Sequence, residues 1–138
     1  MIKENKLIYS LFFLRASVFL VMFMWTVDKF VNPGHAAKVF EKFYHVPGLD
    51  SLIIYGVGII EIVVLLMFFF GLMKTFTYGA VLAFHSVATL SAFSIYLSPF
   101  QGSNLLFFAA WPMLAACVML FLFRNEDIML QFGGNTKA

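Results

Sequence analysis

Charged residues are scarce in this chain, and cysteine and proline are scarcer still. Only 12% of its 138 residues are Asp, Glu, Lys or Arg, whereas 62% are hydrophobic and 19% are aromatic. Ordinary soluble domains are about 45–50% apolar and about 25% charged. A small soluble fold leaves much of its surface in water, so it cannot bury so much apolar area. The composition therefore predicts one domain, residues 1–138, that is integral to a membrane.

The missing residue types exclude several chemistries. Cys117 is the only cysteine, which rules out an internal disulfide, a CxxC redox pair and a Cys-rich metal site. His35 and His45 lie in a loop without other ligands beside them, so we expect no metal site. His85 is the only histidine inside an apolar stretch, so one monomer cannot supply a bis-His haem site. The net charge of +2 is scattered and argues against nucleic acid as a partner.

Long apolar runs are what the sequence does contain. They cover about 7–30 and 51–73, followed by a stretch between Lys74 and Arg124 that has no charged residue. A single helix over that stretch would be about 70 Å long, more than twice a hydrocarbon core of about 30 Å. It must fold back, and the turn-rich segment 98–104 divides it into spans of about 76–97 and 104–123. We therefore predict an all-α, integral membrane four-helix bundle. The first run is too long for a signal peptide and has no clean cleavage site, so we expect it to be retained.

The loop at 31–50 is predicted to contain a short amphipathic helix. Asn32 and Pro33 are suited to the start of a helix, as N-cap and first helical residue. In the following segment, 35–44, the apolar side chains of Val39, Phe40, Phe43 and Tyr44 share one face, which would suit the membrane interface.

Basic residues near the span ends predict the orientation. Cytoplasmic loops of membrane proteins carry an excess of Lys and Arg. Five basic residues fall on the side of the termini and three on the opposite side, so both termini are expected in the cytoplasm and the loop helix outside. The five are Lys3, Lys6, Lys74, Arg124 and Lys137, and the three are Lys29, Lys38 and Lys42.

Three ionisable residues lie well inside the predicted spans: Arg15, Glu61 and His85. Counted along the helices, all three fall at a similar depth, about 12–15 Å from the inner boundary. A charge in hydrocarbon is costly, so the three are expected to face the bundle interior as one polar cluster. Two interpretations remain open. Arg15 and Glu61 form a structural ion pair with His85 beside it, or the cluster binds a polar head group or relays protons.

Two tryptophans mark further candidate positions. Trp111 precedes Pro112 near the middle of the fourth span, where a proline kink would open a cavity beside the cluster. Trp25, Asp28 and Lys29 close the first span at its outer edge. For these three we favour an interfacial anchor with a local charge pair over a binding site.

Several short motifs together resemble the DoxX/DoxD-like family of small four-helix bacterial membrane proteins. They are the Arg15-containing first span, the Trp25-x-x-Asp-Lys-Phe end of that span and the Phe-Tyr-His-Val-Pro-Gly loop. Gly58-Ile-Ile-Glu61, the Gly71-Leu-Met-Lys74 turn and Pro112 continue the likeness along nearly the whole chain.

The resemblance implies a multi-pass protein of the bacterial inner (plasma) membrane. Members of the family are associated with membrane oxidoreductase systems, so it implies an accessory or quinone-interacting subunit, at most part of a quinone-linked enzyme. The residues themselves point to no cofactor, and the resemblance makes a quinone the candidate. The expected partners are the lipid bilayer and a soluble or periplasmic redox protein, with a homo-oligomer left open. The alternative is a small transporter or a structural partner subunit of a membrane complex.

Overall fold

The computed structural model of the protein describes residues 2–132, with side chains from residue 5 onward. Within that range its regular elements are all helices, without a β-strand, which confirms the predicted all-α class. The elements in chain order are α1 (Ile2–Val31), α2 (Pro33–Tyr44), α3 (Ser51–Phe69), α4 (Lys74–Ser91), α5 (Phe93–Tyr96), the 3-10 helix η1 (Asn104–Ala109) and α6 (Ala110–Leu122). Lys137, which contributed to the predicted orientation, lies outside the described residues.

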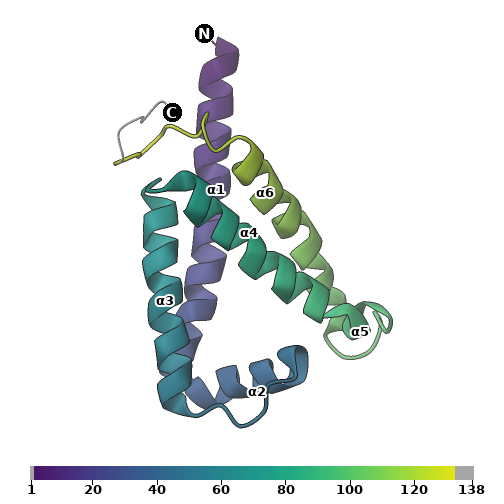
Figure 1. The fold of residues 1–138 in the computed structure, drawn as a ribbon. Helices are drawn as coiled ribbons and strands as arrows, with labels where there is room; N and C mark the ends of the chain where they lie inside the picture. The colour runs from purple at the N-terminus through teal and green to yellow at the C-terminus, as the bar shows by residue number, and fades with distance from the viewer. Residues whose placement is uncertain (1, 133–138) are drawn as a thin grey trace.

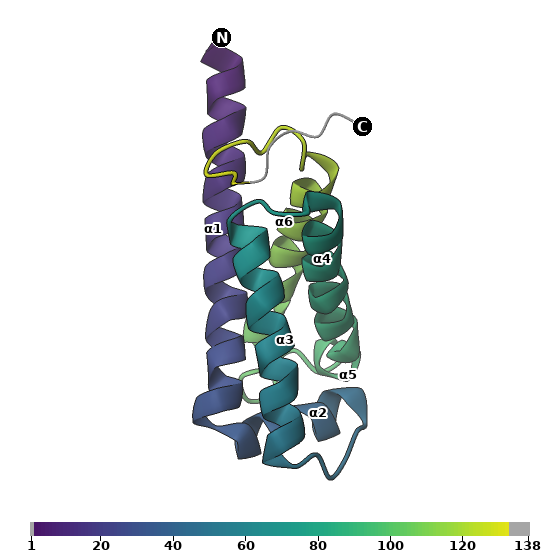
Figure 2. The same cartoon turned by 60° about the vertical axis from the view of Figure 1, so that its left-hand side comes forward.

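Helices α1, α3 and α4 and the η1–α6 segment run alternately up and down, with α1 packed against α3 and α4 packed against α6 (Figures 1 and 2). The short helix α2 lies across the end where α1 stops and α3 begins. The segment after α6 crosses the opposite end, beside the turn that joins α3 to α4. The N-terminal part of α1 projects beyond the other helices at that same end. One end of the bundle is therefore covered by α2 and the other by the C-terminal segment.

Three helical segments are long and apolar enough to cross a membrane: Asn5–Val31, Ser51–Phe69 and Asn104–Leu122. Large apolar side chains also cover the outside of the molecule, with Phe13 and Leu106 about three-quarters exposed. A soluble protein rarely exposes so extensive an apolar surface, whereas lipid accepts it. The protein is therefore a membrane protein whose helices contact the lipid bilayer.

The observed helices differ from the predicted spans at their ends. The second span ends at Phe69 instead of residue 73, because Gly71 turns the chain with a positive φ of 64°. The third, predicted as 76–97, is interrupted at Ala92, between α4 and the single turn α5. The fourth begins as the 3-10 helix η1, and α6 follows from Ala110.

Pro112 is not the mid-helix kink that the sequence predicted. It is the third residue of α6, directly after the 3-10 segment. The first turn of an α-helix has backbone N–H groups without intrahelical partners, so a proline there removes no helical hydrogen bond. Pro112 therefore marks the change from 3-10 to α geometry, and it does not line the cavity described below.

The predicted loop helix is confirmed as α2, with Asn32 at the N-cap position and Pro33 in the first turn. Its apolar face, however, is turned toward the bundle. Phe43 packs on Phe107 with ring centroids 5.9 Å apart, and Tyr44 reaches between the helices. The face expected to rest on the membrane interface thus also closes one end of the fold.

The core lies between α1, α3, α4 and α6. Leu11 and Val18 of α1, Leu65 and Phe68 of α3 and neighbouring side chains of α4 and α6 form one buried cluster. In lipid, close packing and hydrogen bonds replace the hydrophobic effect as the force between helices. The polar groups buried beside this cluster therefore decide much of the arrangement.

Candidate functional site

Arg15 does not meet Glu61, contrary to the predicted pairing. Its side chain is fully buried at the end of the bundle covered by the C-terminal segment, where Nε lies 3.5 Å from Oδ2 of Asp127. Its guanidinium also donates to the hydroxyl of Tyr78 (3.0 Å), and that hydroxyl donates to Asp127 Oδ2 (2.8 Å). A further Arg15 hydrogen bond goes to the carbonyl of Met129. The intramembrane arginine is thus neutralised by a residue after the last helix.

This network fastens residues 123–132, which we call the C-terminal strap, across the α3–α4 turn. Lys74 donates to the carbonyl of Asp127 and to the side chain of Gln131, both at 2.6 Å. The backbone N–H of Phe132 donates to the carbonyl of Phe70 (3.1 Å). Buried charges are stable only when they are paired and hydrogen-bonded. The geometry therefore supports a structural role for Arg15.

Glu61 lies toward the other end and pairs with Lys29. Nζ of Lys29 is 2.9 Å from Oε2 of Glu61, and the hydroxyl of Thr26 donates to the same oxygen at 3.0 Å. The two charged side chains are 13% and 22% exposed, in contrast to the fully buried Arg15 and Asp127. Glu61 therefore keeps a partly accessible carboxylate whose second oxygen, Oε1, makes no ion pair with the residues that the structure describes.

His85 is buried on α4 and is held by one side of its ring. Its Nε2–H donates to the carbonyl of Ala110 on α6 at 3.0 Å, and the hydroxyl oxygen of Thr89 lies 3.2 Å from the same nitrogen. The buried Nδ1 has no hydrogen-bond partner among the described residues. Buried polar atoms are nearly always hydrogen-bonded, so an orphan of this kind calls for a ligand or a water.

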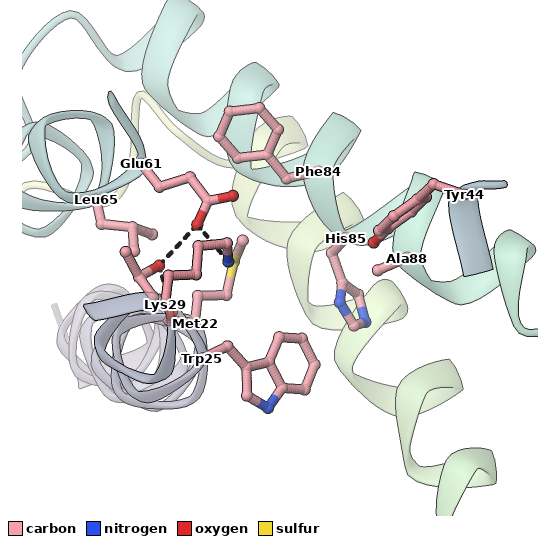
Figure 3. A pocket seen from close by; sticks show the side chains of 10 residues that line it. Met22, Trp25, Lys29, Tyr44, Glu61, Leu65, Phe84, His85 and Ala88 are labelled. Atoms are coloured by element: carbon pink, nitrogen blue, oxygen red, sulfur yellow. Dashed lines mark hydrogen bonds and ion pairs between the residues drawn. The ribbon is translucent and has the colours of Figure 1, made fainter. Parts of the chain in front are cut away.

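Glu61 and His85 do line one cavity, as the predicted cluster required, although Arg15 and Trp111 do not. The cavity has a volume of about 80 Å³ and is lined by residues of α1, α3 and α4 and by Tyr44, the last residue of α2. Figure 3 shows Glu61 and Lys29 on one side of it and His85 and Tyr44 on the other. The lining is completed by Met22, Trp25, Thr26, Leu65, Phe84 and Ala88.

Tyr44 brings a phenol from α2 to this cavity. Burial raises the pKa of Tyr44, and the negative charge of Glu61 raises it further. The phenol therefore stays neutral at physiological pH and can donate a hydrogen bond. With Lys29 it supplies donors, while Glu61 and Nδ1 of His85 supply acceptors.

Of the three candidates at the outer edge of the first span, Trp25 and Lys29 line the cavity and Asp28 does not. Trp25 lies at the rim of the cavity, half exposed, with its ring centroid 6.0 Å from that of His85. Lys29 has become the partner of Glu61. Asp28 instead pairs with His35 at the start of α2 (2.6 Å), outside the cavity. Trp111 packs on Tyr96, with ring centroids 5.6 Å apart.

The sequence contained one overlooked signal. Met22, Trp25, Thr26 and Lys29 follow i, i+3, i+4, i+7 spacing, so they share one face of α1, and all four line the cavity. This spacing predicts that Lys29 faces the interior of the bundle with the other three residues, and not the surface. Asp127 offered no comparable signal, since nothing in a short polar segment after a helix predicts which buried charge it will meet.

The site offers hydrogen-bonding groups and charge rather than a preassembled metal centre. Within the part of the chain that the structure describes, no three His, Cys, Asp or Glu side chains are grouped as metal ligands. Comparison with known proteins adds no assignment: no protein-family model, curated protein or solved structure matches this chain.

Proposed function

We propose that this chain is a four-span protein of the bacterial inner membrane that binds a quinone-like head group in the cavity lined by Glu61 and His85. In this role it would serve as an accessory or quinone-interacting subunit of a membrane oxidoreductase system. The observation that carries the proposal is a small cavity, bordered by an ion pair and by a buried nitrogen without a partner among the described residues, in a helix bundle with an apolar exterior. The resemblance of the sequence to DoxX-like proteins supplies the link to quinone chemistry.

The path of the chain supports a fourth crossing. The chain leaves α3 at one end of the bundle and enters η1 and α6 at the other (Figure 1). If both of these segments cross the membrane, the chain between them must return across it, and α4 with α5 is what returns. α4 carries polar side chains such as Thr77, Tyr78 and Thr89, but all three are buried. Its polarity is therefore turned away from lipid, as membrane helices require.

The size of the cavity favours a head group over a whole ligand. Pockets that enclose a complete small molecule measure about 300–1,000 Å³, and a water needs at least about 10–15 Å³. About 80 Å³ is room for a few waters or one polar ring. Trp25 and Phe84 line the cavity and are also 50% and 37% exposed, so its rim continues into the lipid-facing surface. An apolar tail would remain outside, in the bilayer.

The orientation we propose puts α2 and the cavity on the periplasmic side and the C-terminal strap in the cytoplasm. It rests on the basic residues, of which Lys6, Lys74 and Arg124 belong to the strap end. A soluble redox partner would then meet the face of the protein that carries α2, a few residues from Tyr44 and the cavity.

Tryptophan fluorescence tests head-group binding, because Trp25 lines the cavity and Trp111 does not. In a Trp111→Phe background, where Trp25 alone emits, a short-tailed quinone should quench the emission saturably. The converse variant, Trp25→Phe, is a matched control. Trp111 is 45% exposed, close to the 50% of Trp25, so it reports non-specific quenching by quinone dissolved in the micelle.

Saturable quenching confined to Trp25, weakened by Lys29→Gln but not by Lys42→Gln on the exposed side of α2, is the expected result. Equal, non-saturating quenching of Trp25 and Trp111 would refute the head-group proposal. Purification in mild detergent followed by mass spectrometry of co-purified proteins and lipids tests the subunit role separately.

A further inference from the structure

In its neutral form, His85 presents an acceptor, Nδ1, to the cavity that it lines (Figure 3). The carbonyl of Ala110 can only accept, so the nitrogen 3.0 Å from it, Nε2, must carry the proton. The hydroxyl of Thr89 donates to the backbone carbonyl of His85 at 2.8 Å, so its oxygen is left to accept from the same Nε2–H. Both neighbours of Nε2 thus select one tautomer. A neutral imidazole with its proton on Nε2 has a bare lone pair on Nδ1.

That lone pair has no partner within residues 5–132, although His85 is only 1% exposed. A ligand that satisfies it must bring a hydrogen-bond donor. The same ligand can also accept a hydrogen bond from Tyr44, whose phenol lines the cavity, and from Lys29, which already pairs with Glu61. A hydroxyl group meets both demands, since its hydrogen donates while its oxygen accepts. A carbonyl group meets only the second.

We infer that the cavity selects the hydroxyl-bearing, reduced form of an aromatic head group, a hydroquinone or phenol, over the oxidised dicarbonyl form. This rests on the proposed function and adds the ligand class that the site prefers. The oxidised form would leave Nδ1 of His85 buried and unpaired, whereas the reduced form pairs it. Loss of one hydrogen bond to a buried group corresponds to roughly a three- to tenfold weaker affinity.

The tautomer and the contact are both visible to nitrogen NMR. His35 and His45 are exposed, so a His35→Gln/His45→Gln variant leaves His85 as the only imidazole signal. Selective ¹⁵N labelling of histidine should show a protonated Nε2 and an unprotonated Nδ1 before ligand is added. A short-tailed hydroquinone, added without oxygen, should move the Nδ1 resonance, and its dimethyl ether, which has no donor, should not.

Calorimetric titration compares affinities, with His85→Phe as the variant that keeps a ring but removes both nitrogens. Hydroquinone should bind wild-type protein about three to ten times more tightly than the matching quinone, and His85→Phe should abolish that preference. Should the variant fail to fold, the NMR comparison in protein with native His85 decides alone.

The outcomes separate this inference from the proposed function. Binding of both forms with equal affinity, or an Nδ1 resonance that hydroquinone does not move, overturns the preference and leaves head-group binding standing. Absence of binding by either form overturns both.

Discussion

Asp127→Asn is the substitution with the largest expected effect on stability. Asp127 and Arg15 are both completely buried, and the variant would leave the guanidinium with neutral contacts alone, among them the hydroxyl of Tyr78, the carbonyl of Met129 and the ring of Phe12. Removing one partner of a buried ion pair costs about 3–5 kcal/mol, because the other charge is left uncompensated. We expect a loss in that range, and a similar one for Arg15→Gln. The double variant should lose less than the sum of the two.

The assay is equilibrium unfolding by SDS in mixed micelles, followed by circular dichroism, for both single variants and the double. Residues that share a network show coupling energies of about 0.5–3 kcal/mol, whereas residues with no shared partner add within about 0.3–0.5 kcal/mol. A second cycle between Arg15 and Glu61 is the control. Their polar contacts involve different residues, so that cycle should be additive.

Additivity between Arg15 and Asp127 would refute the strap network. Coupling between Arg15 and Glu61 would restore the pairing that the sequence alone predicted. Because the two cycles share Arg15→Gln, a variant that merely unfolds would affect both equally and could not imitate the expected contrast.

Two further predictions rest on local geometry and a third on the distribution of basic residues. Gly58→Ala should be less stable than Gly56→Ala by about 1–3 kcal/mol, because the Cβ at 58 would lie 2.7 Å from the ring of Phe30, which stacks on Tyr55, whereas a Cβ at 56 has nothing within 4 Å; SDS unfolding compares the pair. Pro112→Ala should change stability by less than about 1 kcal/mol in the same assay, since residue 112 lies in the first turn of α6. Reporter fusions after Asp50 should read exterior and those after Lys74 cytoplasmic, and the reverse would contradict the proposed orientation.

Much of the fold could be read from the sequence because lipid imposes simple rules. Apolar length predicted where helices lie, and the charge-free stretch had to turn near residues 98–104. Asn32 and Pro33 predicted the start of α2. What remained hidden was the internal break at Ala92 and the 3-10 start of the last helix. Hydropathy does not distinguish a continuous helix from one that is broken or overwound.

The site was harder to predict, because depth along a helix says nothing of direction around it. Arg15, Glu61 and His85 were placed at one level by counting residues, and this brought Glu61 and His85 to one cavity as expected. Arg15 found its counter-charge outside the spans, at Asp127. The prediction assumed that charges inside the membrane pair with other charges inside the membrane segments. It therefore did not consider Asp127, which lies after the last helix and folds back onto the bundle.

The two charged networks differ in exposure, which gives them opposite expected responses to mutation. Lys29 and Glu61 are 13% and 22% exposed and border a cavity with room for a few waters, so water can take the place of the missing partner when one of them is replaced. Exposed pairs contribute about 0–1 kcal/mol, and this partly exposed pair should lie near the top of that range. Glu61→Gln should therefore cost about 1 kcal/mol in SDS unfolding, far less than Asp127→Asn, while weakening saturable quenching of Trp25 by quinone. A loss of stability as large as that of Asp127→Asn would mean that Lys29 and Glu61 form a structural bridge. The cavity would then be a gap beside that bridge, and binding would have to be sought elsewhere on the molecule.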